Sequence, residues 1–367
     1  MKKALLVLLL LAVAGGLFAQ SLTWSGFARS GLMVAVPEDD DGDTTFHAYN
    51  PDPANRLRFE LNTAATTAAG NAGAAGRIRW NTALNGDRAF SFEWAYAWFR
   101  PIGDAVTNGL TIYGGRMDNN NWHIPAGFDS SNSIASDYNG ALLRYDTAGL
   151  SFGLGVYPEN AEVADGRYAF GVRYTSAGVF DVAANLHYNG AGNNGDGVTN
   201  VVAGVNILAL SGMGLSRLAV DVRAEDLSNL SWLGIGPRIH FDVAGINTGL
   251  RSQVYLPMGD SEEDLDAAVT VWAAMPVTSV VTVRLDAGFE LNAGLRAKTD
   301  VGAFDYRAWD GLPRAIGGGD DSLVIVSPSL SLNIGGGTLA AGYSLLSQLG
   351  DNSATRHAIW TTFNVGF

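Results

Sequence analysis

The sequence contains no cysteine. The chain can form no disulfide and carry no lipid on an N-terminal cysteine, which excludes a disulfide-stabilised scaffold and a lipoprotein. Lysine is also scarce, since Lys298 is the only one beyond Lys2 and Lys3. Acidic residues outnumber basic ones by 36 to 23, and the formal net charge of −13 argues against nucleic acid as a partner.

The chain has one long apolar run, and it lies among the first residues. There, Lys2 and Lys3 precede an apolar run, Ala4 to Val13, and small residues follow up to Ala19. This order is typical of a secretory signal, and the run is shorter than the roughly 20 residues that a spanning helix needs. The sequence therefore predicts a signal peptide over residues 1–19, cleaved after Ala19, and one mature domain over residues 20–367.

The absence of a spanning helix limits how such an exported chain can enter a membrane. In lipid, the only other structure that satisfies every backbone polar group is a closed β-barrel. Hydrophobic residues make up 47% of the chain, charged residues only 16%, and there are 46 glycines. This composition favours strands and turns over a helical core.

Alternation with a period of two is the dominant pattern from Leu22 onward. In RLRFELNT, apolar residues at Leu57, Phe59 and Leu61 alternate with polar ones, as in a strand with one face in lipid and the other in water. Other apolar sets with this spacing predict further outward faces, many of them aromatic: Phe90, Phe92, Trp94, Tyr96 and Trp98; Tyr168, Phe170, Val172 and Tyr174; Leu218, Val220 and Val222; Val281, Val283, Leu285 and Phe289.

The connections between these segments alternate between short turns and longer polar loops. Asp146 to Gly149 and Ala274 to Val277 are short, whereas Asn189 to Val198 and Asn292 to Asp321 are long. Outer-membrane barrels have short turns on the periplasmic side and longer loops outside. The sequence thus predicts an all-β fold, a closed antiparallel transmembrane β-barrel of 16 to 18 strands, which is wide enough to enclose water.

The end of the chain fits the same prediction. Ile359, Thr361, Phe363, Val365 and Phe367 share one face of a last strand that ends in an aromatic residue. This strand resembles the terminal strand of bacterial outer-membrane proteins. The resemblance implies that Phe367 is an assembly signal, read by the assembly machinery of the outer membrane.

Two further segments resemble the general diffusion porins of Gram-negative bacteria. These are IYGGRMDNNNW, Ile112 to Trp122, and YNGALLRYDTAGLSFGLGVY, Tyr138 to Tyr157. Gly115 and Arg116 match the step that precedes the long third loop of that family. The strand after the loop is matched by Asn139, Arg144, Tyr145 and Asp146. The resemblance implies that the third loop, Asp118 to Asp137, folds into the lumen and narrows it.

The same resemblance predicts a charged pore constriction. Its acidic side would be the third-loop residues Asp118, Asp129 and Asp137, and its basic side Arg29, Arg58 and Arg79 on the first strands, with Arg116 and Arg144 beside the loop. Opposed charges of this kind orient water and favour polar solutes. The alternative is that each arginine pairs with a neighbouring acid, such as Glu60 or Glu93, and stabilises the wall.

The sequence offers little other chemistry. The acidic runs Glu38 to Asp43 and Ser261 to Asp266 are typical of solvated loops, and the first lacks the glutamate that completes a helix-loop-helix calcium site. The five histidines are scattered singly, without the spacing of a metal or catalytic site. We therefore expect no catalytic residues, no metal and no cofactor, and the protein is not expected to be an enzyme.

Together these features predict a porin in the bacterial outer membrane, a water-filled channel for passive diffusion of small hydrophilic solutes and ions. The expected partners are outer-membrane lipids, these solutes and the assembly machinery. The sequence does not fix the oligomeric state, for which a homotrimer is one candidate. The alternative function is a surface adhesin or structural outer-membrane protein that binds through long acidic loops such as Pro37 to Asn55.

Overall fold

The computed structural model describes residues 19–37, 44–49, 56–83, 88–103, 108–117, 122, 139–158, 166–190, 199–210, 214–227, 229–259, 265–291, 322–350 and 354–366. These residues form nineteen strands. The strands are β1 (Ala19–Pro37), β2 (Thr45–Tyr49), β3 (Arg56–Thr67), β4 (Ala72–Ala83), β5 (Arg88–Gly103), β6 (Asn108–Arg116), β7 (Asn139–Thr147), β8 (Leu150–Tyr157), β9 (Arg167–Ser176), β10 (Phe180–Asn189), β11 (Thr199–Ile207), β12 (Leu215–Glu225), β13 (Trp232–Val243), β14 (Ile246–Pro257), β15 (Asp266–Pro276), β16 (Val281–Leu291), β17 (Ser322–Asn333), β18 (Gly337–Leu349) and β19 (Ala354–Gly366).

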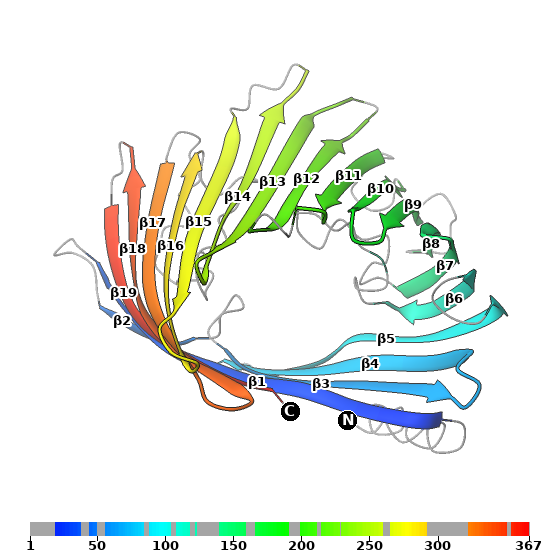
Figure 1. Ribbon diagram of the computed structural model, residues 1–367, viewed down its shortest axis with the longest axis horizontal. Helices are drawn as coiled ribbons and strands as arrows, with labels where there is room; N and C mark the ends of the chain where they lie inside the picture. The colour runs from blue at the N-terminus through cyan, green and yellow to red at the C-terminus, as the bar shows by residue number, and fades with distance from the viewer. Residues whose placement is uncertain are drawn as a thin grey trace.

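The strands form one antiparallel sheet that closes on itself (Figure 1). From β3 to β19 each strand pairs with the next in the chain, and β1 pairs with both β3 and β19. The ring therefore has eighteen strands and no free edge, as predicted at the upper end of the 16 to 18 range.

The short strand β2 is the one element that the sequence did not predict. It lies within Pro37 to Asn55, which the alternation of connections assigned to a loop, and it pairs with Gly31 to Ala35 of β1. The backbone of β1 extends beyond its pairing with β3, which ends at Arg29, so β2 supplies hydrogen-bond partners to the rest of it.

The two faces of the sheet differ in chemistry. On β16, Val283, Leu285 and Phe289 are exposed, whereas Asp286 and Glu290, each next to one of them in the chain, are buried. In a closed barrel, side chains on the convex face splay outward and those on the concave face crowd together. The convex wall is therefore apolar and the concave inner wall polar, which is the alternation expected of a barrel in lipid. The predicted outward sets on β9, β12 and β16 are confirmed.

The predicted outward set on β5 is wrong beyond Phe92. Arg77 of β4 pairs in register with Trp94, and Ile78 pairs with Phe92, so Glu93 is an extra residue in β5. This β-bulge inverts the alternation. Phe90 keeps the outward position and is 56% exposed, whereas Trp94 is buried and the guanidinium of Arg77 lies over its ring. Tyr96 and Trp98 follow Trp94 onto the inner wall.

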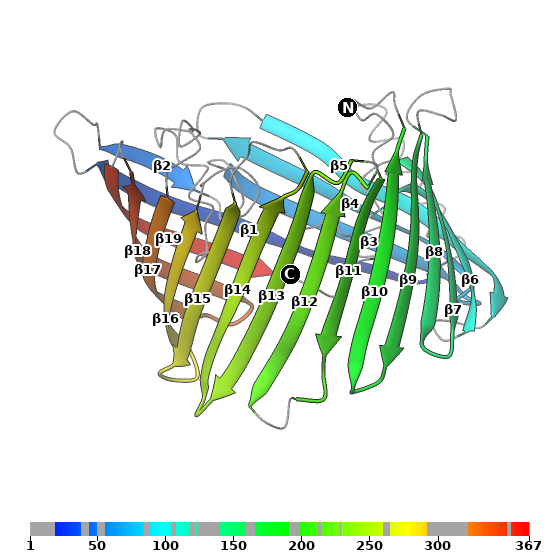
Figure 2. The same cartoon turned by 90° about the horizontal axis from the view of Figure 1, so that it is seen from above.

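Most connections sort by length onto the two ends of the barrel, whose strands lie side by side and tilted in Figure 2. Residues 68–71, 148–149, 244–245 and 334–336 are short turns at one end. The first residue of β1, Ala19, pairs near the turn after β3, and Val365 pairs with Gly337 beside another short turn. Both ends of the described chain therefore lie at the short-turn end. The strand ends joined by the predicted long connections, such as Asn189 to Val198 and Asn292 to Asp321, lie at the other end. The sorting is incomplete, since the connection over residues 208–214 is at the short-turn end and is longer than those over residues 84–87 and 350–353 at the other end.

Candidate functional site

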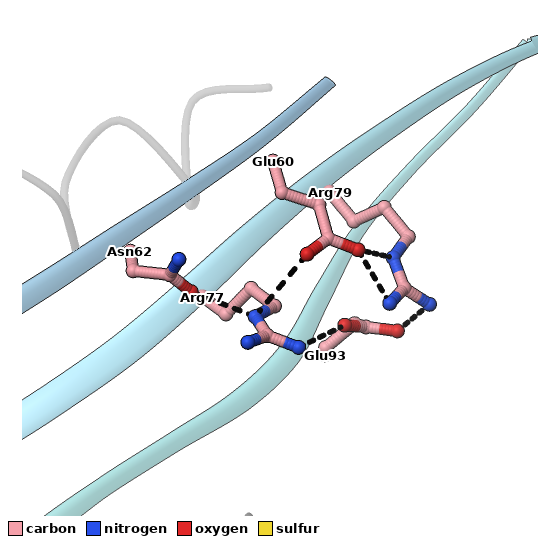
Figure 3. Close-up of polar contacts among 5 residues, drawn as sticks. All are labelled: Glu60, Asn62, Arg77, Arg79 and Glu93. Carbon is pink, nitrogen blue, oxygen red and sulfur yellow. Dashed lines mark hydrogen bonds and ion pairs between the residues drawn. The ribbon is translucent and has the colours of Figure 1, made fainter. Parts of the chain in front are cut away.

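The inner wall of β3, β4 and β5 carries a network of four charged side chains (Figure 3). Arg79 donates to Glu60 through Nε at 2.6 Å and forms an ion pair with Glu93. Arg77 lies 3.5 Å from Glu60 and 3.4 Å from Glu93, and donates to Asn62 at 2.7 Å. Each carboxylate thus contacts both guanidiniums.

Two features of the backbone assemble this network. Glu60 and Arg79 are register partners on β3 and β4, as are Asn62 and Arg77. Glu93 of β5 follows the outward-facing Phe92 and therefore lies on the inner wall, at the bulge where β5 pairs with Arg77 and Ile78 of β4. The formal charges of the two arginines and two glutamates sum to zero. For Arg79, this arrangement matches the alternative prediction, in which an arginine pairs with neighbouring acids such as Glu60 or Glu93.

Arg144 occupies the inner wall of β7 and also has an acidic partner. Its guanidinium donates to both carboxylate oxygens of Asp146, at 2.9 to 3.0 Å, and Ser151 of β8 donates to the same carboxylate at 2.5 Å. Residues two apart on a strand share a face, so an Arg-x-Asp sequence places the pair side by side.

The same local pattern recurs further around the ring. Arg223 pairs with Glu225 at 3.0 Å on β12, and Arg284 pairs with Asp286 at 2.7 Å on β16. We did not identify these pairs from the sequence, although the motif Arg-x-Asp/Glu within an alternating segment is visible there. The pair of Arg173 and Asp181, at 2.5 Å, joins β9 to β10 and depends on the register of the two strands.

Trp122, which follows β6 in the chain, lies against the inner wall of other strands. Its side chain is 3% exposed, and its indole Nε1 donates to Oδ1 of Asn185 on β10 at 3.0 Å. The guanidinium of Arg144 lies 5.7 Å from the centre of its ring. Gly171 of β9 leaves the space that the indole fills, because a Cβ there would lie 2.8 Å from it.

The indole belongs to a small apolar cluster on the same wall. Met117, at the end of β6, packs with Trp122 and with buried side chains of β7, β8 and β9. Tyr96 and Tyr113 pack against this cluster from β5 and β6. Residues at both ends of the segment Met117 to Trp122 are therefore attached to the inner wall.

The structure describes only some of the other predicted constriction residues. Arg29 and Arg58 are register partners on β1 and β3, and their side chains lie outside the described part. Arg116 is exposed and pairs in register with Ala95 and Asn139, which are also exposed and belong to the outward-facing positions. The loop residues Asp118, Asp129 and Asp137 lie outside the described residues, as does Phe367.

An open hollow of about 730 Å³ lies on the inner wall of β13 to β19. Three arginines line it, Arg238, Arg251 and Arg284, together with His240, two tryptophans and several hydroxyl and amide side chains. The described residues that line it include no aspartate or glutamate. The described linings of the two sides of the lumen therefore differ, since acidic and basic side chains are equal in number in the network on β3 to β5, whereas the charged side chains that line the hollow are arginines.

The described residues contain neither a metal-binding cluster nor a helix that could span a membrane. In that part of the chain, no group of three or more histidine, aspartate or glutamate side chains is arranged to hold a metal ion. Nor does it contain a helix that is long and apolar enough to cross a membrane.

Solved structures with the same architecture are channel proteins of the bacterial outer membrane. OpdQ of Pseudomonas aeruginosa matches with a TM-score of 0.59 and 9% identity, over 95% of this chain and 99% of that one. OccK2 (OpdF) of the same species matches with a TM-score of 0.59 and 11% identity, over 95% and 99%. OccAB4 of Acinetobacter baumannii gives 0.55 and 10%, over 95% and 99%.

The comparisons by sequence give no match. No protein-family model matches this chain, and no curated protein matches it. At 9 to 11% identity the structural likeness shows the fold, which is the eighteen-stranded barrel of outer-membrane porins.

Proposed function

We propose that the protein is a porin of the bacterial outer membrane, through which small hydrophilic solutes and ions diffuse passively. The observation that carries this proposal is the contrast between the two faces of a closed ring of eighteen strands. Its outer wall is apolar, whereas its inner wall carries ion pairs on β3 to β5, β7, β9, β12 and β16. A barrel of this size is too wide to be filled by its own side chains and encloses water.

The proposal includes the export and assembly route predicted from the sequence. Residues 1–19 are a signal peptide removed after Ala19, and residues 20–367 form the barrel. The outer-membrane assembly machinery reads the terminal aromatic, Phe367. In the described part of the last strand, the exposed side chains of Ile359 and Phe363 on one face support this role, because they give the strand the lipid-facing surface of a barrel wall.

We also propose that the third loop, Asp118 to Asp137, narrows the lumen. The packing of Trp122 against Asn185 and Gly171 supports this, since the chain after β6 contacts the inner wall of strands that lie beyond β7 and β8 in the ring. Asp118, Asp129 and Asp137 then face arginines across the lumen. Arg79 and Arg144 belong to this constriction together with Arg29 and Arg58. Arg116 is left out because of its outward register.

Selectivity measurements test the charged constriction. Changing Asp118, Asp129 and Asp137 to Asn removes negative charge and should shift the reversal potential toward anions. Changing Arg29, Arg58 and Arg79 to Ala leaves Glu60 and Glu93 undercompensated and should shift it toward cations. The shifts should shrink as salt is raised, because the Debye length falls from about 10 Å at 0.1 M to about 3 Å at 1 M.

The measurement is the reversal potential under a salt gradient for the wild type and both triple variants. Opposite shifts support the constriction. If clear conductance is seen and neither set of substitutions moves the reversal potential, the narrowest section lies on other residues. A folded barrel with no conductance would instead favour the adhesin or structural role.

The role of Trp122 gives a prediction of its own. Truncating a buried tryptophan costs about 3–5 kcal/mol of packing, so Trp122→Ala should release the loop from the wall. We expect larger open-channel current fluctuations and a changed single-channel conductance. The matched control is Trp98→Ala, which removes an inner-wall indole that lies over Gly73 and Arg100 instead. Identical recordings from both variants would show that Trp122 does not position the loop.

A further inference from the structure

Arg116 places a charged side chain on the outer wall of the barrel. Tyr113 and Met117 of the same segment pack into the apolar cluster of the inner wall, so Arg116, one position before Met117, points the other way. The backbone before it requires glycine, because Gly115 has a φ of +125° and a Cβ there would lie 2.5 Å from the carbonyl oxygen of Ala95. The Gly-Arg step therefore presents a guanidinium to the surroundings of the barrel.

This guanidinium has no acidic partner among the described residues. The inner-wall arginines Arg77, Arg144 and Arg284 each form an ion pair. On the outer face of β6 to β10, Arg116 is also the one charged side chain that the structure describes. A charge on a lipid-facing wall is destabilising at the membrane centre and is tolerated near the headgroups. Its counter-charge therefore has to come from outside the barrel.

The position of Arg116 along the wall is that of the lipid headgroups. Arg116 is the last residue of β6, and its register partner Asn139 is the first residue of β7. Tyr168 and Tyr188 lie one residue from the same ends of β9 and β10, with 6.2 Å between the centres of their rings. Tyrosines mark the boundary between lipid and water in barrels of this kind. Arg116 thus lies at this boundary on the side of the long connections, which is the side of the outer leaflet.

The residues around Arg116 complete a contact for a lipid. Register partners on neighbouring strands have Cβ atoms about 5 Å apart, so the exposed amide of Asn139 and the guanidinium of Arg116 reach one group together. Toward the membrane centre, the next outward positions are Ala97, Gly114 and Ala141, which are register neighbours and exposed. A Cβ added at Gly114 would meet no atom within 4 Å. These three positions carry no large side chain, so an acyl chain can lie close to the backbone there.

We propose that Arg116 and Asn139 bind the phosphate of an anionic lipid in the outer leaflet, while an acyl chain of that lipid packs over Ala97, Gly114 and Ala141. A guanidinium donates two parallel hydrogen bonds to phosphate oxygens, and the amide of Asn139 donates a third. The formal net charge of the chain is −13, so a preference for an anionic lipid has to arise from a local contact. The site lies on the outer wall and does not depend on whether the barrel conducts.

Native mass spectrometry of the folded barrel measures this preference. The protein in detergent micelles is incubated with equal amounts of dioleoyl phosphatidic acid and dioleoyl phosphatidylcholine, and the lipid that stays bound after removal of the micelle is identified. The wild type should retain phosphatidic acid in preference to phosphatidylcholine. Arg116→Gln should weaken the binding of phosphatidic acid about fivefold, which is the upper contribution of an exposed ion pair. Glycerol phosphate added in excess should not displace the lipid, because it has no acyl chain.

Arg100→Gln is the matched control. It removes the same charge from β5, the strand beside β6, but Arg100 lies on the inner wall, where its Nε donates to Thr111 at 3.3 Å. This substitution should leave the binding of phosphatidic acid unchanged. Circular dichroism establishes that both variants are folded before they are compared.

Four results would overturn the site. The wild type retains both lipids equally; Arg100→Gln weakens phosphatidic acid as much as Arg116→Gln; glycerol phosphate displaces the lipid completely, as expected of a site for free phosphate; or the wild type has the mass of several chains and Arg116→Gln has the mass of one, which would assign the guanidinium to a contact between copies. None of these results bears on conductance, so the proposed channel is tested separately.

Discussion

Glu60→Gln is expected to lower the free energy of unfolding by about 3 kcal/mol, because removing one partner of a buried ion pair leaves the others uncompensated. The side chain of Glu60 is only 2% exposed and contacts both Arg77 and Arg79. After the substitution, two guanidiniums share the single carboxylate of Glu93. The estimate is at the lower end of the range for buried pairs because the arginines are 20 to 25% exposed.

Glu93→Gln is the matched control for this effect. Glu93 contacts the same two arginines, but its side chain is 21% exposed and lies on the bulge. Its loss should cost about 1 kcal/mol or less, as for exposed ion pairs. Urea-induced unfolding from lipid vesicles, followed by tryptophan fluorescence, measures both values. Equal losses in the two variants would show that burial of Glu60 does not set the strength of the network.

Leu285→Arg should impair assembly strongly, because it places a charge near the middle of the lipid-facing wall. Leu285 lies on the outer face of β16 and is 49% exposed. Arginine at the bilayer midplane destabilises barrels of this class by about 2–4 kcal/mol. Thr282→Arg, on the inner face of the same strand, is the control and should insert normally. The readout is the yield of folded protein in vesicles, and equal yields would contradict the assignment of the two faces.

The strands and the barrel could be predicted from the sequence because alternation is a local property. Sets such as Val281, Val283 and Leu285 repeat every second residue, so the pattern can be recognised without knowing any contact between distant parts of the chain. The same locality explains the error on β5. A bulge is set by how β5 pairs with β4, so the inversion after Phe92 leaves no mark in the spacing of aromatic residues.

Among the charged contacts of the inner wall, those between nearby residues could also be predicted from the sequence, whereas those between separate strands could not. Arg144 with Asp146 and Arg284 with Asp286 lie two residues apart and are visible in the sequence. The four-residue network and the hollow are not, because they depend on which residues of separate strands become register partners. Arg238 and Arg251 illustrate this, since they are thirteen positions apart and meet only through the pairing of β13 with β14.

Trp122 is the residue for which the sequence gave the least information. A lone tryptophan in a polar connection has no periodicity, and its partners Gly171 and Asn185 lie far along the chain. The only signal was indirect, through the resemblance of Ile112 to Trp122 to the segment that leads into the third loop of diffusion porins. That resemblance predicted an inward loop without naming the contact that attaches it.

Planar bilayer recording tests the central claim most directly. The purified, refolded protein is added to one side of a lipid bilayer at fixed voltage, and the current is followed. A porin of this architecture should give discrete current steps of uniform size that increase with salt concentration. Absence of steps, from protein shown by circular dichroism to be folded and by flotation to be inserted in the same lipid, would contradict the proposal that this barrel is a channel.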